Sequence, residues 1–185
     1  MKIFNEYEAM DSSQERIAYP MERENLCGIA IARTIFHNNH GIVTHEDYLR
    51  EIAEGPSRRY DVLNEGTDLS SLKLMARNFG LGLFSRLNSA VDDLNPFIEN
   101  GLWPMIHRPS DYDAGGTYAV VYEYEPKIKL FFPSPKNKGE LKEESHVEFD
   151  KKWHFPELGE KWFGVFYDPK KMSKKLKRII YKYHA

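Results

Sequence analysis

The residue best suited to chemistry in this sequence is its only cysteine, Cys27, in the run Asn25-Leu26-Cys27-Gly28. An apolar stretch containing alanine follows, which predicts that the thiol lies at the N-terminus of a helix. The partial positive charge of a helix N-terminus favours the thiolate, the nucleophilic form of cysteine. A lone cysteine is also often a small buried apolar residue. Cys27 is therefore a candidate nucleophile, and its chemistry depends on whether a base stands beside it.

His107 is the candidate base. It is expected at the end of one strand, beside a neighbouring strand that begins at Thr117, so that its imidazole could reach Cys27. Asp111 and Asp113 in the following loop could orient the ring. The alternative is that His107 is a loop-edge residue with no part in chemistry.

Three further histidines cluster near the end of the first predicted helix: His37, His40 and His45. The first two have helical spacing, and a zinc site would need further ligands such as Glu46 or Asp47. We favour the interpretation that they are surface polar residues, two of them near a helix C-terminus. No metal and no cofactor is expected.

Helices are expected in the first half of the chain. Residues 26–38 are apolar almost all round, which predicts a buried helix. Thr44 is a predicted cap of a second helix, and Thr67 or Asp68 of a third that stops at Gly80. A small helix is expected near residues 91–100.

Strands are expected mainly in the second half. Short strands are predicted at 81–87, 103–107 and 162–166, and the strongest signal is a hairpin, 117–124 with 127–132. This hairpin brings Thr117 close to Phe132, at the end remote from the turn. Residues 134–144 are expected to form an exposed loop. Helices first and an antiparallel sheet afterwards predict an α+β fold.

The motifs resemble those of papain-like cysteine peptidases that remove double-glycine leader peptides from bacteriocins. The run around Cys27 resembles the family's nucleophile motif. Residues 116–121 resemble the strand that begins with the catalytic histidine, and residues 128–133 resemble the strand that ends in an Asp-Pro carrying the third triad member. The resemblance covers most of residues 20–167. It implies a papain-like fold, with N-terminal helices packed on a C-terminal antiparallel sheet.

The same resemblance implies that three catalytic positions are lost. Thr117 stands at the position of the family's histidine, Phe132 at that of its aspartate, and Met21 at that of its oxyanion-hole glutamine. A thiol without an imidazole lacks both the general base and the acid that protonates the leaving amine. We therefore expect a domain that binds a peptide or protein ligand without cleaving it. The alternative is an active cysteine peptidase or hydrolase that pairs Cys27 with a relocated His107.

Three regions are expected along the 185 residues: an N-terminal arm at 1–20, a peptidase-type domain at 21–168 and a basic C-terminal helix at 169–185. From residue 170 onward there are seven Lys or Arg and no acid, although the whole chain has a net charge of −2. This helix could meet an anionic surface, but we favour packing of its apolar stripe on the domain. Neither a signal peptide nor a transmembrane segment is expected, nor specific nucleic-acid binding, so a cytoplasmic location is predicted.

Overall fold

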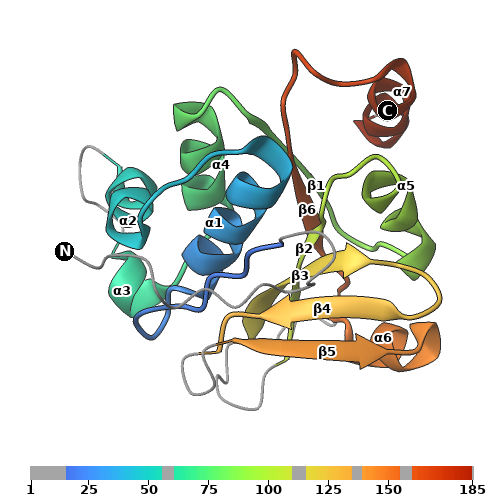
Figure 1. Ribbon diagram of the computed structural model, residues 1–185, viewed down its shortest axis with the longest axis horizontal. Coiled ribbons are helices and arrows are strands. Elements are labelled where there is room, and N and C mark those ends of the chain that lie inside the picture. Colours follow the sequence, from blue (N-terminus) through green and yellow to red (C-terminus); the bar gives the residue numbers. More distant parts are fainter. Residues whose placement is uncertain (1–15, 56–60, 110–115, 135–138, 155–159, 185) are drawn as a thin grey trace.

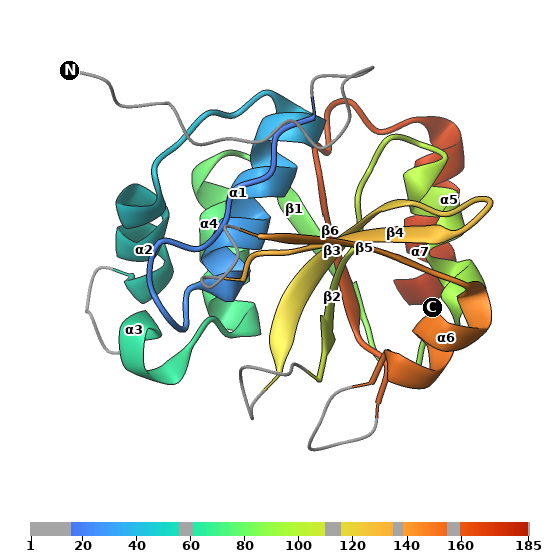
Figure 2. The ribbon, with the colours of Figure 1, turned by 60° about the horizontal axis from the view of Figure 1, so that its bottom comes forward.

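The computed structural model describes residues 16–55, 61–109, 116–134, 139–154 and 160–184. In this part of the chain, four helices form one layer, a six-stranded sheet follows, and the remaining helices cover the other side of the sheet (Figure 1, Figure 2). The described residues therefore have the predicted α+β architecture.

The first helical layer contains α1 (Cys27–His40), α2 (Glu46–Glu54), α3 (Val62–Glu65) and α4 (Leu69–Asn78). The first ten residues of α1 are all buried, as its all-round apolar sequence predicts. The helix ends at Gly41, which adopts the left-handed conformation (φ 67°); its N–H donates to the carbonyl of His37, and the N–H of Ile42 donates to that of Phe36. The single-turn helix α3 was not predicted.

Of the two predicted helix caps, the one of α4 is confirmed and the one of α2 is not. Asp68 caps α4, and its carboxylate accepts the N–H of Ser71 at 2.7 Å. The prediction of Thr44 as the cap of α2 is wrong, because the extended residue before that helix is His45, whose Nδ1 accepts the N–H of Asp47. The carbonyl of Thr44 instead accepts a hydrogen bond from Arg33.

The sheet is antiparallel throughout and has the order β1-β6-β2-β3-β4-β5. Its strands are β1 (Gly82–Arg86), β2 (Met105–Arg108), β3 (Thr117–Glu123), β4 (Ile128–Phe132), β5 (Glu140–Glu144) and β6 (Phe163–Tyr167). The predicted hairpin is β3–β4. Its register differs from the prediction by two residues, since Val120 pairs with Phe131 and Val121 with Leu130. Extended to the start of β3, this register puts Thr117 opposite Ser134.

The two faces of the sheet pack into separate cores. The α1 face, which carries Met105, Val120 and Phe131, packs on the first helical layer. The opposite face, here called the α6 face, carries Ile106, Ala119 and Val121. It packs on η1 (Val91–Asp93), α5 (Asn95–Ile98), α6 (His146–Lys152) and α7 (Lys174–His184).

Two C-terminal features complete the fold. The predicted exposed loop is wrong over its last part, because Glu140–Glu144 forms edge strand β5, whose polar sequence ELKEE gives little apolar signal. Leu176 and Ile180 of α7 are buried, so its apolar stripe packs on the domain as favoured. None of the helices in the described residues is long and apolar enough to cross a membrane.

Candidate active site around Cys27

Cys27 is the first residue of α1, and its side chain is 7% exposed. The preceding residue, Leu26, provides no side-chain cap, and the first turn of the helix contains no acidic residue. No carboxylate in that turn therefore opposes the effect of the helix dipole on the thiol. The position is the one predicted for a nucleophilic cysteine.

The N-terminus of α1 is held against the loop before α4. A Cβ atom added at Gly28 would lie 2.6 Å from Cβ of Thr67, so only glycine allows this approach. The side-chain amide of Asn25, whose φ is 67°, donates to the carbonyl of Leu63 at 2.8 Å. These contacts fix the turn that presents the thiol.

Tyr118 of β3 joins the sheet to the loop that contacts this turn. Its hydroxyl donates to the carbonyl of Thr67 at 2.9 Å, and its ring packs edge-on against Trp162. Tyr118 thus connects β3 to the loop that contacts Gly28.

His107 lies beside Tyr118, on the α1 face. The two residues are register partners in β2 and β3, and their ring centroids are 4.9 Å apart at an angle of 80°. His107 is 7% exposed. A continuous series of contacts therefore runs from the Cys27 turn through Thr67 and Tyr118 to His107. Asp111 and Asp113, predicted to orient this imidazole, lie outside the described residues.

Thr117 and Phe132 lie together, as predicted, but on the α6 face. Both line a cavity with Arg108, the register partner of Thr117. The family's catalytic position at Thr117 therefore lies on the sheet face opposite α1. Because β3 is buried on both faces, its sequence has no apolar and polar alternation that could indicate which residues face α1.

Met21 lies in the same apolar cluster as Cys27 and is 7% exposed. Its backbone N–H donates to the carbonyl of Pro133 at 3.1 Å. A thioether has no N–H group, so this side chain cannot donate a hydrogen bond to an oxyanion. Residue 21 therefore shares a cluster with the cysteine but lacks the amide that the resemblance implies.

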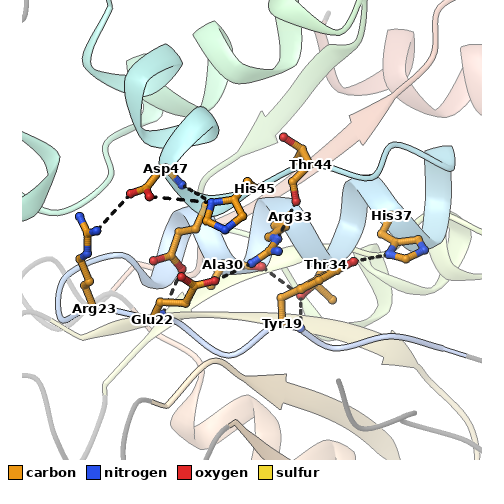
Figure 3. Close-up of polar contacts among 11 residues, drawn as sticks. Tyr19, Glu22, Arg23, Ala30, Arg33, Thr34, His37, Thr44, His45 and Asp47 are labelled. Carbon is orange, nitrogen blue, oxygen red and sulfur yellow. Dashed lines mark hydrogen bonds and ion pairs between the residues drawn. The ribbon is translucent and has the colours of Figure 1, made fainter. Parts of the chain in front are cut away.

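The segment that leads to Cys27 is held by an ionic network around the buried side chain of Arg33, which the sequence did not predict (Figure 3). Arg33 is 2% exposed; its Nη1 donates to Glu22 at 3.1 Å and its Nε to the carbonyl of Thr44 at 2.9 Å. The guanidinium also lies over the ring of Tyr19, 4.1 Å from its centroid. The only available sequence signal was a charged residue in an otherwise apolar helix.

Glu46 completes this network. It is 2% exposed, and its Oε2 accepts the backbone N–H of Glu22 at 3.1 Å. Burial raises the pKa of Glu46 to about 7, and the carboxylate of Glu22 acts in the same direction. The N–H of Glu22 and the charges of Arg33 and Arg23 oppose this rise without cancelling it.

The three clustered histidines each have a structural contact. His37 is hydrogen-bonded to the hydroxyl of Tyr19, a ring nitrogen of His40 lies 3.2 Å from the carbonyl of Phe166, and His45 caps α2. Each of the three histidines therefore has a different partner. Among the residues that the structure describes, no group of three or more His, Cys, Asp or Glu side chains could hold a metal ion.

Comparison with known proteins identifies the fold. The chain is similar to the peptidase domain of Streptococcus ComA, a bifunctional ABC transporter involved in a quorum-sensing pathway. The TM-score is 0.57 and the sequence identity is 19%, and the match covers 80% of this chain and 95% of that one. A double-glycine motif protease from an AMS/PCAT transporter, solved with its leader peptide, gives a TM-score of 0.57 at 16% identity, covering 80% and 89%. No family model and no curated protein matches the sequence. The chain therefore has the papain-like fold of double-glycine peptidase domains.

Proposed function

We propose that this chain is a catalytically degenerate papain-like domain that binds a peptide or protein segment without cleaving it. The observation that carries the proposal is the residue that β3 contributes next to the Cys27 turn. That residue is Tyr118, whose hydroxyl already donates to the carbonyl of Thr67. A phenol hydroxyl that donates a hydrogen bond cannot replace an imidazole as the general base at neutral pH.

The other two positions support the same proposal. Thr117 and Phe132 lie on the α6 face and carry no group that titrates near neutral pH. Met21 has no donor for an oxyanion. In a cysteine peptidase, loss of the residues at these positions removes several orders of magnitude in rate.

A peptide ligand is proposed from the fold. One of the similar structures is a protease in complex with a leader peptide. The α1 face here offers aromatic side chains, with Tyr118 packed against both Trp162 and His107. Aromatic side chains line many of the grooves that bind extended peptides.

A second candidate function is favoured by the position of His107. Its ring packs on Tyr118, on the face that contacts α1, so the alternative of a cysteine hydrolase with a relocated base is geometrically consistent. In that mechanism the imidazole of His107 takes the proton of Cys27 and later protonates the leaving amine.

The pH dependence of Cys27 alkylation by iodoacetamide distinguishes the two functions. It is measured in the native protein, in His107→Ala and in the control His146→Ala, which removes a histidine that faces Glu125 elsewhere. The proposal predicts that the apparent pKa of the thiol is equal in all three proteins, and that a synthetic leader peptide ending in Gly-Gly binds uncleaved. A thiol pKa that rises only in His107→Ala, together with peptide cleavage lost in Cys27→Ala, would establish the hydrolase instead.

A further inference from the structure

We propose that a cavity on the α6 face binds a small molecule that carries a carboxylate or phosphate group. The cavity has a volume of about 390 Å³ and is lined by residues of β2, β3, β4, β5 and α6. Such a volume is typical of small-molecule sites. Its charged side chains are Arg108, Lys142, Lys151 and Lys152, with Glu140 and Glu144. This set is called the basic cavity below.

A buried ion pair forms the rigid part of the basic cavity. Arg108 and Glu144 are 6% and 5% exposed, and the guanidinium donates to both carboxylate oxygens, at 2.9 and 3.4 Å. Lys152 donates to the same carboxylate at 3.0 Å. Burial raises the pKa of Glu144, but the hydrogen bonds from Arg108 and Lys152 outweigh this and hold the pKa below its usual range. Glu144 is thus ionised, and its carboxylate is paired with Arg108 and Lys152.

The remaining charge favours an anion. Among the described residues that line the cavity, four basic side chains stand against two carboxylates, which leaves an excess of two positive charges. Lys142 is paired with Glu140 at 3.3 Å, but both side chains are at least one-third exposed, so this pair contributes little and can exchange for a ligand. An oxyanion would replace water around these ammonium groups with charge-assisted hydrogen bonds.

A further observation indicates that the ligand combines an oxyanion with a compact apolar part. The ring of Phe132 lies beneath both Arg108 and Lys142, with centroid distances of 5.3 and 5.1 Å. The cavity therefore combines partly exposed lysines with an aromatic wall.

The test is a titration of the full chain with two probes, inorganic phosphate and N-acetylglycine, at low ionic strength. Backbone amide shifts of β5 and α6 are followed by NMR. The variant Lys142→Gln/Lys151→Gln removes two cations from the cavity and leaves the buried Arg108–Glu144 pair intact. The matched control, Lys174→Gln/Lys177→Gln, removes the same charge from α7, where both lysines are exposed.

The proposal expects saturable binding of at least one probe, weakened about tenfold or more in the cavity variant and unchanged in the control. Saturation by phosphate alone indicates a phosphate ligand, and tighter binding of N-acetylglycine indicates a carboxylate ligand. The proposal is overturned if neither probe saturates in the native protein, or if both double variants weaken binding equally, since binding would then follow net charge and not the cavity.

Discussion

Replacing Glu46 with glutamine is expected to stabilise the protein at neutral and alkaline pH, but not at acid pH. The side chain is 2% exposed, and its pKa is about 7 in the folded protein against 4.5 as its ordinary value. Glutamine has nearly the same shape, and its amide oxygen can still accept the N–H of Glu22. The substitution therefore removes the ionisation of the side chain and keeps its hydrogen bond.

The sign follows from proton uptake. Between pH 4.5 and about 7 the unfolded chain has released the proton of Glu46 and the folded chain has kept it, so the free energy of unfolding falls as pH rises. The difference between the two pKa values lowers the free energy of unfolding by roughly 3 kcal/mol once the pH lies well above 7. Below pH 4.5 the carboxyl is neutral in both states and resembles the amide.

The assay is urea unfolding of the native protein and Glu46→Gln at pH 4.5 and pH 8. The free-energy difference between the two proteins should be small at pH 4.5 and should reach about 3 kcal/mol in favour of the variant at pH 8. Glu51→Gln, an exposed position on the same helix, is the matched control and should show no such change. A variant that is no more stable at pH 8 than the native protein would refute the assignment of a neutral buried carboxyl.

Three further outcomes are expected, each measured by urea unfolding. Gly28→Ala should destabilise the protein by about 1–3 kcal/mol, because its Cβ would overlap with Thr67; unchanged stability would contradict this close approach. Tyr118→Phe should cost about 1–3 kcal/mol at neutral pH, since it leaves the carbonyl of Thr67 without its donor. Glu144→Gln should cost roughly 3–5 kcal/mol at pH 7 by leaving Arg108 uncompensated, and this cost should shrink as pH falls below 4.5, where the native carboxylate becomes protonated. A cost independent of pH would argue against the ionised pair.

Local patterns allowed most of the helices and the β3–β4 hairpin to be predicted. The all-round apolar run of α1 and the capping carboxylate of Asp68 act within a few residues of their own position, so both are visible in the sequence. β5 was missed because its stability comes from pairing with β4, and its own side chains are mostly charged. The Arg33–Glu46 network was missed for the same reason, since it joins three segments of the chain.

The candidate site was predicted in part. The position of Cys27 follows from its local sequence, whereas the direction in which β3 presents its side chains depends on packing. Successive residues of a strand point to opposite faces of the sheet. Tyr118 therefore lies on the cysteine side, and its neighbour Thr117 lies on the side of the basic cavity. Sequence spacing brought Thr117 to the correct strand end but could not assign its face.

The same alternation separates the two proposed sites. His107 and Arg108 are neighbours in β2, yet His107 packs on Tyr118 on the α1 face and Arg108 pairs with Glu144 on the α6 face. A peptide at the Cys27 turn and an anion in the basic cavity would therefore lie on opposite sides of one strand end, connected through β2 and β3. If each site binds independently, alkylation of Cys27 should leave phosphate affinity unchanged. A change in that affinity would mean that β2 and β3 transmit a displacement between the faces, and each ligand would then alter the affinity of the other by the same factor.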